Sequence, residues 1–584
     1  MAGKSPRFGG AVAGTVSCVI LRMSTLFLRT LREDPADAEV PSHRLLVRAG
    51  YIRRIAAGVY GWLPLGKRVL DNVARIVRAE MDAIGAQEVA LPALLPAEPY
   101  QRTGRWEIYG SELFRLKDRR DGDFLLGPTH EEVVTLLVKG EYSSYRDLPV
   151  TLYQIQNKYR DELRPRSGVI RAREFVMKDA YSFHTDTDSL KATYEEFRRA
   201  YERVFTRVGL DYRIVEAQAG TIGGDVNNEF LAPAEAGEDL FVSCTACDYA
   251  ANVEAAHVGR GEVSVPDEGH PPMSEVPTPG APGIDAVVAV LGDIDAGQML
   301  KTILYRIGGE YTAVLLPGDR EVDETRLAAA VAPAPVELIG EQDFAARPDL
   351  VRGYAGPQGM RERGVRVLAD VRVLPHTTWV TGANKPDHHV RNAVTGRDFT
   401  VDGYLHVATL AAGDPCPRCS CPLHIGRGIE VGHIFQLGRK YTDALELDVT
   451  GPDGTPVRVM MGCYGLGVSR VVASVVEQSA DAAGLCWPAE IAPADVHVVA
   501  VGKGTEQRDA AERLARELDE AGRRVLLDDR AVAAGVAFAD ADLLGVPTIV
   551  VVGKALAEGA VEVKDRRSGE RRRVPLDRLA AELG

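Results

Sequence analysis

Two arginines stand next to an aromatic residue in a pattern that suits nucleotide binding. Arg160 and Arg171 flank a polar loop between two runs that are typical of strands, and Phe175 follows in the second run. A guanidinium is a planar fork of donors that binds phosphate or carboxylate and stacks on rings. The segment therefore indicates a hairpin that binds a triphosphate carrying an adenine.

A glycine-rich segment later in the chain carries a third arginine. Gly462–Arg470 (GCYGLGVSR) places three glycines before an apolar run, which predicts a helix from Val468 to Val476. Free N–H groups in the first turn of a helix attract anions. Arg470 lies in that turn and is a second candidate for phosphate binding.

Together the two segments resemble motifs 2 and 3 of the class II aminoacyl-tRNA synthetases. An amphipathic helix that stops at Gly85, followed by a strand over Gln87–Leu91 that ends at Pro92, resembles motif 1 of the same family. Motif 1 forms the dimer interface in that family. The resemblance therefore implies a homodimer.

Four further segments are similar to the bacterial-type prolyl-tRNA synthetases: Gly127–Glu132 (GPTHEE), Phe175–Phe183 (FVMKDAYSF), Glu430–Gly438 (EVGHIFQLG) and Gly462–Gly465 (GCYG). The likeness runs from about Met23 to the C-terminus. It implies activation of L-proline with ATP and Mg²⁺, followed by transfer of the amino acid to tRNA(Pro).

The resemblance also implies roles for single residues in activation. Arg160 would bridge the α-phosphate and the amino-acid carboxylate, Phe175 would stack on adenine, and Arg470 would hold the γ-phosphate. Three more side chains would orient the nucleotide: Glu162, Arg171 and Gln436.

Proline presents a secondary ammonium within a small apolar ring, which calls for an acid and an acceptor beside a tight pocket. Thr129 and Glu131 match the proline-binding loop of the family, and His130 would point away if the segment is extended. Without the resemblance, Glu131 and its neighbour Glu132 are acids at a helix N-terminus. The resemblance adds two pocket residues: Cys463, packed against the ring, and His433.

The predicted fold class is α/β multidomain with an α+β catalytic core. The resemblance implies a catalytic domain built on an antiparallel sheet, an inserted α/β editing domain and a C-terminal α/β anticodon-binding domain. A Pro/Gly-rich linker is expected over 265–283. The expected regions are an extension or misassigned start (1–22), the first catalytic half (23–243), the insertion (244–421), the second catalytic half (422–488) and the anticodon-binding domain (489–584).

The insertion resembles a domain that hydrolyses mischarged alanyl-tRNA(Pro). Binding alone discriminates poorly against a smaller side chain, because each missing methylene is worth only about 1–3 kcal/mol. Lys301 matches the functional lysine of that domain, and Asp370 and His389 are looser matches. His388 is an alternative to His389.

Two Cys-x-x-Cys pairs flank the insertion. An insertion leaves and re-enters its host at neighbouring points, so four thiolates could bind a structural Zn²⁺ ion. The alternative is two pairs of reduced thiols without metal. The predicted ligands are Cys244, Cys247, Cys416 and Cys419, with Cys421 as a spare.

Composition excludes several classes of protein. With 584 residues, 45% hydrophobic, the chain is expected to be globular with several domains. A net charge of −14 argues against indiscriminate polyanion binding, although local basic patches such as 564–573 (KDRRSGERRR) leave room for RNA contact or for a solvated turn. Eight cysteines, four of them in two Cys-x-x-Cys pairs, do not suggest a disulfide framework and favour the reducing cytoplasm. The apolar stretch within 1–22 is too short to span a membrane, so no membrane association is expected.

Two alternatives to a prolyl enzyme stay open. Another class II synthetase, of the threonyl or histidyl type, would share the C-terminal domain but would not carry this insertion. A non-catalytic protein that senses tRNA or an amino acid would be expected to lose Arg160, Arg470 or whole domains, and all of these are present.

Overall fold

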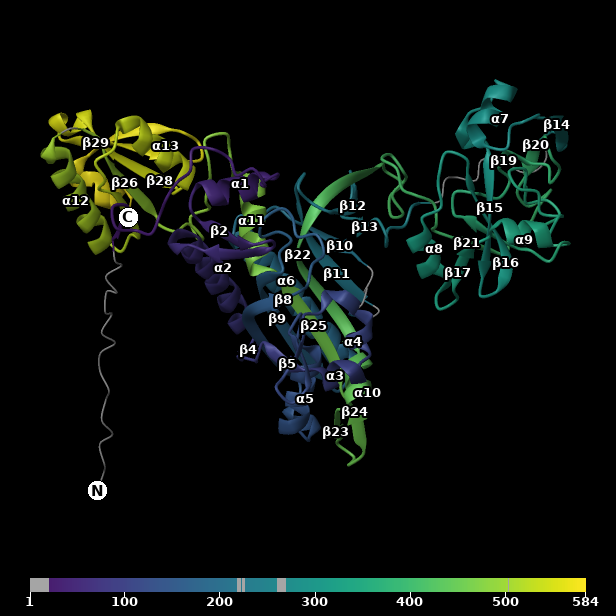
Figure 1. The fold of residues 1–584 in the computed structure, drawn as a ribbon, viewed down its shortest axis with the longest axis horizontal. Helices are drawn as coiled ribbons and strands as arrows, with labels where there is room; N and C mark the ends of the chain where they lie inside the picture. Colours follow the sequence, from purple (N-terminus) through teal and green to yellow (C-terminus); the bar gives the residue numbers. More distant parts are fainter. Residues whose placement is uncertain (1–19, 218–221, 223–225, 260–268, 503, 584) are drawn as a thin grey trace. The chain divides into compact units, whose positions relative to one another are not determined.

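The computed structural model describes residues 20–217, 222, 226–259, 269–502 and 504–583, and it falls into two compact units (Figure 1). The first unit comprises Met1–Arg213, Ala219–Glu238 and Arg427–Gly584. The second comprises Ile214–Gln218 and Asp239–Gly426. Residues 1–19 of the expected extension and 265–268 of the expected linker lie outside the described residues. Among the described residues, no helix has the length and apolar character needed to cross a bilayer.

The first unit is organised around a mostly antiparallel sheet. Its strands in this unit, in spatial order, are β11 (Val226–Pro233), β22 (Leu423–Gly438), β25 (Met460–Leu466), β9 (Glu174–His184), β8 (Val150–Tyr159) and β4 (Gln87–Glu88). Only the short pairing of β4 with β8 is parallel. The sheet places the two strands of the predicted arginine hairpin beside the strand that carries Cys463.

Three helices cover one face of this sheet: α2 (Pro64–Ala83), α6 (Thr187–Arg207) and α11 (Val468–Ser479). Each has an apolar stripe at helical spacing that packs inward. Helix α2 ends before Gly85, whose φ of 76° only glycine adopts readily. Helix α6 is capped by Asp186, whose carboxylate accepts from the Ser189 N–H. Because the helices occupy this face, the opposite face is left for a site.

The glycine-rich segment differs from the prediction. Gly462–Leu466 is part of β25, a central strand, and only Gly467 precedes α11 as its N-cap. Gly462 is required by packing, because a Cβ there would lie 2.2 Å from the hydroxyl of Tyr464. Cys463 therefore sits in the sheet and Arg470 in the first turn of α11.

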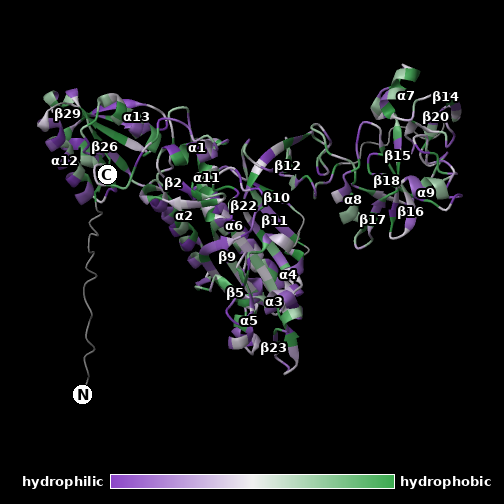
Figure 2. Ribbon diagram, viewed as in Figure 1, coloured by the Kyte–Doolittle hydropathy of each residue, from purple (hydrophilic) through white to green (hydrophobic). Residues whose placement is uncertain are grey.

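A second sheet occupies the C-terminal part of this unit. Its order is β1 (Leu21–Arg22), β27 (Val525–Asp528), β26 (Val496–Ala500), β28 (Thr548–Val552), β29 (Ala560–Asp565) and β30 (Arg571–Pro575). Helix α12 (Thr505–Glu520) packs on one face and α13 (Ala534–Leu544) on the other, over a core of valines and leucines. Figure 2 shows these strands as the hydrophobic interior of the domain.

The N-terminal strand corrects the boundary expected at Met23. Leu21 and Arg22 pair with Leu526 and Leu527 in parallel register, and the Met23 N–H donates to the Leu527 carbonyl at 2.9 Å. Arg22 also forms an ion pair with Glu512. Residues 20–22 therefore belong to the C-terminal sheet and are not an unstructured extension.

The second unit contains a five-stranded mixed sheet and a three-stranded antiparallel sheet. The first has the order β17 (Val336–Leu338), β15 (Leu300–Ile307), β16 (Glu310–Pro317), β18 (Arg366–Asp370) and β21 (Gly403–Leu405). The second has the order β14 (Ser274–Pro277), β20 (His388–Val394) and β19 (Thr378–Gly382). Helices α7 (Ile284–Leu291), α8 (Glu324–Val331) and α9 (Glu341–Ala346) accompany them.

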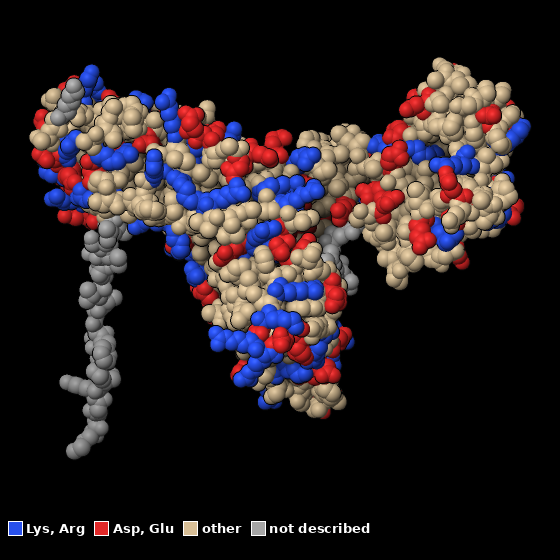
Figure 3. Space-filling view, in the orientation of Figure 1, with Lys and Arg blue, Asp and Glu red and all other residues tan. Residues whose placement is uncertain are grey.

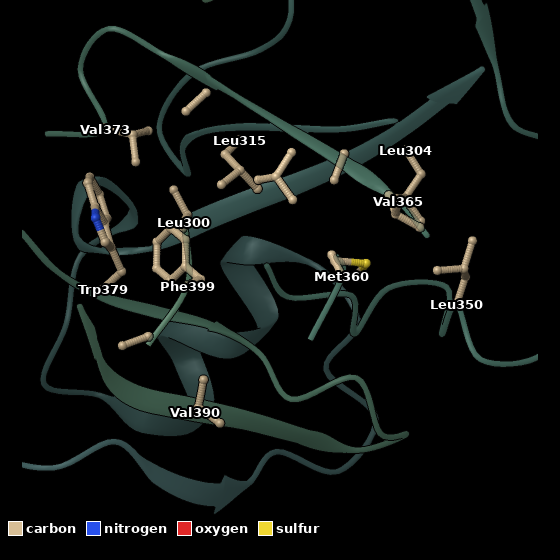
Figure 4. Close-up of a cluster of buried hydrophobic side chains, with 14 of the residues drawn as sticks. Leu300, Leu304, Leu315, Leu350, Met360, Val365, Val373, Trp379, Val390 and Phe399 are labelled. Carbon is tan, nitrogen blue, oxygen red and sulfur yellow. The ribbon is translucent and has the colours of Figure 1, made fainter. Parts of the chain in front are cut away.

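Buried side chains from both sheets meet in one core. Figure 4 shows Leu300 and Leu315 with Trp379 and Phe399 in this cluster. The expected linker contributes structure as well, because β14 lies within 265–283 and pairs with β20. The insertion is thus an α/β body with its own hydrophobic core.

Surface charge is mixed. On the face that Figure 3 presents, Lys and Arg are interspersed with Asp and Glu. The net charge of the chain is −14, so recognition of a polyanion would depend on local basic patches.

Candidate functional site

The face of the sheet opposite to α6 gathers the predicted site residues. The register pairs Lys158 with Phe175 and Tyr181 with Cys463, and residues directly opposite each other project to the same side. Arg160 follows β8 directly, and its guanidinium carbon lies 5.3 Å from the centroid of the Phe175 ring. The Nε of Arg160 is buried and has no protein partner among the described residues. A buried donor without a partner is suited to an anionic ligand.

Arg470 reaches the same region from the first turn of α11. Its guanidinium donates to the Ile170 carbonyl at 3.1 Å and to the Glu430 carboxylate at 3.0 Å. Partial burial would raise the pKa of Glu430, but hydrogen bonding to His433 and the charges of Arg470 and Arg160 lower it to about 2. Glu430 thus lies within the electrostatic reach of both predicted phosphate-binding arginines.

Glu162 and Arg171 are brought together, but they engage each other. Arg171 donates to Glu162 at 3.0 Å and also pairs with Glu238. Burial opposes ionisation of Glu162, and the hydrogen bond from Arg171 outweighs it and lowers the pKa of Glu162. To contact a nucleotide, both side chains would have to give up these hydrogen bonds or share them with the ligand.

Gln436 is placed on the other face of the sheet. It pairs with Gly462, which in turn pairs with Ser182, whereas Phe435 pairs with Cys463 and Tyr181. Strand alternation therefore turns Gln436 away from the face that carries Cys463. This register argues against the predicted contact of Gln436 with ATP.

A buried acid cluster forms the deepest part of the site. Arg105 donates to Glu131 at 2.7 Å, to Glu132 at 3.0 Å and to the Thr129 hydroxyl at 2.8 Å. Thr129 donates in turn to Glu131. Burial opposes ionisation, yet the charge of Arg105 and the hydrogen bonds lower the pKa of Glu131 to about 2. Burial raises the pKa of Glu132. Glu131 begins helix α5 (Glu131–Glu141), so the predicted extended segment ends at His130.

Cys463 closes the cluster on the side of the sheet. Its Sγ lies 3.4 Å from Glu131 Oε1, and burial raises its pKa well above the ordinary value. The residue therefore stays a thiol. His433 lies beside Glu430 with its Nδ1 at 3.1 Å from that carboxylate, and its ring stacks on Phe435 at 3.8 Å.

His130 turns away from the acid cluster, as predicted for the residue between Thr129 and Glu131. Its Nε2 lies 2.8 Å from the Pro92 carbonyl, and its Nδ1 accepts from the buried Lys158 ammonium at 2.7 Å. Lys158 also pairs with Asp179. These contacts fix the loop that carries Thr129 and Glu131.

The second unit holds a separate cavity of about 1050 Å³. Lys301 and His389 both line it, together with the apolar side chains of Leu304, Ile339 and Phe344. His389 Nδ1 lies 2.6 Å from the Thr278 hydroxyl, and burial lowers the pKa of His389 to about 4.

The other two residues considered for this site lie elsewhere. His388, the alternative histidine, is next to Glu275 and does not appear among the described residues that line the cavity. Asp370 is also absent from that lining; it accepts hydrogen bonds from the N–H groups of Val407 and Ala408 and pairs with Arg372.

The four predicted thiols converge. Sγ of Cys244 lies 3.4 Å from that of Cys419, Sγ of Cys247 lies 3.7 Å from that of Cys416, and all four fall within 4.8 Å of one another. Tetrahedral zinc with Zn–S near 2.3 Å would separate its sulfurs by about 3.8 Å. The geometry fits the ion, and Cys421 lies outside this group of four.

Sequence reasoning missed three residues of the main site. Glu430 lies within one of the motifs but has no separate signal there, and Glu229, which lies across the sheet from His433, carries no local signal. Arg105 was overlooked because an arginine is mostly exposed unless paired, and its two acidic partners lie 26 and 27 positions away.

Comparison with known proteins gives a consistent picture. Residues 114–479 match the family model described as tRNA synthetase class II core domain (G, H, P, S and T), and residues 495–584 match the anticodon binding domain. A proline–tRNA ligase of Streptomyces coelicolor is 59% identical over 565 residues, which cover 97% of this chain and 99% of that protein. One from Mycolicibacterium smegmatis is 54% identical over 580 residues, with the same coverage.

Solved structures share the fold at low sequence identity. Prolyl-tRNA synthetase from Cryptosporidium parvum, complexed with halofuginone and AMPPNP, superposes with a TM-score of 0.55 at 12% identity, covering 93% of this chain and 75% of that one. The Giardia lamblia enzyme in complex with prolyl-adenylate gives a TM-score of 0.55 at 13% identity, covering 92% and 74%.

Proposed function

Since the chain belongs to the family of proline–tRNA ligases, with a class II synthetase core and an anticodon-binding domain, we propose that its first unit activates L-proline with ATP and transfers it to tRNA(Pro). The proline carboxylate attacks the α-phosphorus of ATP, the bond between the α-phosphorus and the bridging oxygen breaks, and pyrophosphate leaves. The protein supplies positioning and charge for this step and forms no covalent bond.

The observation that carries the proposal is the buried, ionised carboxylate of Glu131. The carboxyl groups of Glu131 and Glu132 share the guanidinium of Arg105; burial raises the pKa of Glu132, whereas the contacts of Glu131 lower its pKa to about 2. Because Arg105 is shared, a cationic amino group bound beside Glu131 would complete the pairing of this charge, and buried charges are tolerated only when they are paired. The Cys463 thiol, buried next to Glu131, would pack against the apolar ring of the same ligand.

The nucleotide would lie over the same face. Arg160 would hold the α-phosphate and the proline carboxylate with its unpartnered Nε, Phe175 would stack on adenine, and Arg470 would hold the γ-phosphate. Glu162 and Arg171 would orient the nucleotide after exchanging their mutual contacts.

Mg²⁺ has suitable ligands here. Carboxylate oxygens of Glu229 and Glu430 and a ring nitrogen of His433 lie within 4.8 Å of one another, and Mg²⁺ is usually bound by one or two carboxylates together with substrate phosphates. When bound, the ion would neutralise charge on the phosphates. Glu229 and Glu430 would hold it beside Arg470.

Proline-dependent exchange of pyrophosphate into ATP tests this assignment. A panel of amino acids should give exchange with proline and with no more than weak signals from threonine or histidine. Arg470→Ala should reduce exchange by roughly a hundredfold, in line with loss of a transition-state charge contact. Arg516→Ala, an exposed arginine on α12, serves as the matched control. Binding of tRNA without any exchange would favour the sensing protein instead.

We propose hydrolysis of mischarged alanyl-tRNA(Pro) for the cavity of the second unit. The support is that Lys301 and His389 line one apolar cavity, and that a second hydrolytic site is expected where binding discriminates poorly. Lys301→Ala should leave proline activation unchanged and slow alanyl-tRNA deacylation. Lys385→Ala, an exposed lysine of the same unit paired with Glu275, should change neither.

A structural Zn²⁺ ion on Cys244, Cys247, Cys416 and Cys419 is proposed from the sulfur geometry. Metal analysis of protein purified without chelators should find about one zinc per chain. Cys244→Ser should remove the ion and Cys421→Ser should retain it. Metal-free protein with all four thiols reduced would refute the site.

Assembly and location are part of the proposal. A homodimer through α2 and the strand that follows it is supported by apolar side chains left exposed in the flanking segments, Ile55 (73%) before α2 and Leu94 (55%) after the strand. Light scattering of the purified protein at micromolar concentration would test it. Free cysteines and dependence on ATP and tRNA support a cytoplasmic location.

A further inference from the structure

The ammonium group of Lys301 is held by a single turn of the chain. It donates to the Arg320 carbonyl at 2.7 Å and to Glu321 Oε1 at 2.6 Å. The Glu321 side chain is 76% exposed, whereas that of Lys301 is only 14% exposed. Exposed ion pairs contribute little, so the main-chain carbonyl of Arg320 is the contact that fixes the ammonium.

Arg320 is not among the described residues that line the cavity, and its side chain belongs to a chain of alternating buried charges. Arg320 donates to Asp414 Oδ1 at 2.9 Å, and Arg372 donates to Asp414 Oδ2 at 2.8 Å. Arg372 also pairs with Asp370, which is fully buried. Acid and base alternate along this chain, so each buried charge is compensated.

Asp414 belongs to the segment that carries the second cysteine pair. It stands two residues before Cys416, and its Oδ2 also accepts from the Ala411 N–H at 2.9 Å. The next residue, Pro415, accepts from the Gly259 N–H at 2.7 Å. Cys416 packs in one hydrophobic cluster with Val371, the residue after Asp370. The carboxylate of Asp414 is therefore fixed by the Ala411 N–H and by Arg372, in the segment that leads into the cysteine pair, and it holds Arg320 through its other oxygen.

We propose that Asp414 is a positioning residue for Lys301, on which it acts through Arg320, and that Asp414 takes its place from the segment that leads into the cysteine knuckle. This inference rests on the proposed hydrolytic function of the cavity. It would also give Asp370 a part in the reaction without lining the cavity, since Asp370 pairs with Arg372 and Arg372 donates to Asp414.

Single-turnover deacylation of alanyl-tRNA(Pro) by the full-length protein tests the inference. Asp414→Asn keeps the shape of the side chain and removes the charge, so it should lower the rate constant roughly ten- to a hundredfold, as expected for a displaced reacting group. The concentration of tRNA that gives half the maximal rate should stay unchanged. Zinc content and proline-dependent exchange should also stay at the parental level.

Arg320→Ala retains the main-chain carbonyl but loses the contact with Asp414, and it should slow deacylation to a similar extent. If the two residues act as one unit, the double variant should be no slower than either single variant. Asp349→Asn breaks an Arg–Asp pair of the same unit outside this chain of charges and is the matched control.

The possible outcomes distinguish failure of the positioning role of Asp414 from failure of the hydrolytic function of the cavity. If Lys301→Ala deacylates at the parental rate, the hydrolytic function fails and the inference fails with it. If Lys301→Ala is slow while Asp414→Asn and Arg320→Ala are both unaffected, only the inference is overturned. A double variant slower by the product of the two single effects would also overturn it. Should Asp414→Asn lose zinc, Arg320→Ala decides the matter because it leaves the knuckle intact.

Discussion

The guanidinium of Arg105 lies 2.7 Å from the carboxylate of Glu131, and neither side chain has exposed surface. Arg105 also lies over the rings of Tyr100, Tyr109 and Tyr441, at 4.9–5.8 Å from their centroids. This aromatic enclosure excludes water, so the pair cannot be replaced by solvation. Arg105, together with the hydroxyl of Thr129, therefore keeps Glu131 ionised and oriented.

Arg105→Met should impair proline binding more than ATP binding. The change removes a charge-assisted hydrogen bond worth about 1.5–3 kcal/mol, which corresponds to roughly a ten- to hundredfold higher KM for proline. The KM for ATP in pyrophosphate exchange should change little. Arg102→Gln, a partly exposed arginine three residues earlier, is the control. Equal effects on both substrates would show that Arg105 only supports the fold.

Removal of residues 1–22 should lower stability, whereas removal of 1–19 should not. The longer deletion cuts off β1 and the Arg22–Glu512 pair and exposes the edge of β27. Thermal unfolding would register the difference as a midpoint several degrees lower. Arg22→Ala should give a smaller decrease than the deletion. Identical midpoints for the two shortened proteins would contradict a structural role for Leu21 and Arg22.

Lys178→Met should stabilise the protein at neutral pH. Burial between the sheet and α6 lowers the pKa of Lys178 to about 7, against about 10.5 in the unfolded chain. The parental protein thus loses stability as the pH falls from about 10 to 7, and it loses no more from this residue below 7. The advantage of the variant should grow over the same interval and then level off. Lys191→Met, at an exposed position of α6, should show no such trend; a constant difference from pH 7 to 10 would refute the explanation.

Deacylation by the second unit should not depend on ionisation of His389 between pH 8 and 5. Burial lowers its pKa to about 4, so the imidazole stays neutral throughout this interval. Rates measured against uncatalysed hydrolysis at each pH should therefore show no step near 6.5. If the parental protein shows a step near pH 6.5 and His389→Gln does not, the ring of His389 is more hydrated than its packing against Thr278 and Tyr354 indicates.

The sequence allowed the class II fold to be predicted because its motifs are local. The strands around Arg160 and Phe175 and the helix that carries Arg470 each follow from short-range patterns, and the structure places them on one sheet. The pairing of two Cys-x-x-Cys segments followed from topology alone, and their sulfurs meet as expected.

What the sequence could not predict depended on register or on distant partners. The face to which Gln436 projects is decided by the pairing of β22 with β25, since one residue of shift reverses it. Asp370 and Asp414 are brought together through Arg372, across 44 positions, and no local pattern predicts that link. The same holds for β1, whose partner strand is near the opposite end of the chain.

The pairing of Leu21 with Leu526 also determines when the last sheet can fold during synthesis. A ribosome adding about 5–20 residues per second needs roughly half a minute to nearly two minutes to make the intervening chain of about 500 residues. Until β27 has been made, the first strand has no partner, although the catalytic residues up to Arg470 have by then been synthesised. The last sheet can close only after translation has nearly finished, so a nascent chain that stalls before β27 leaves its own beginning exposed to chaperones and proteases.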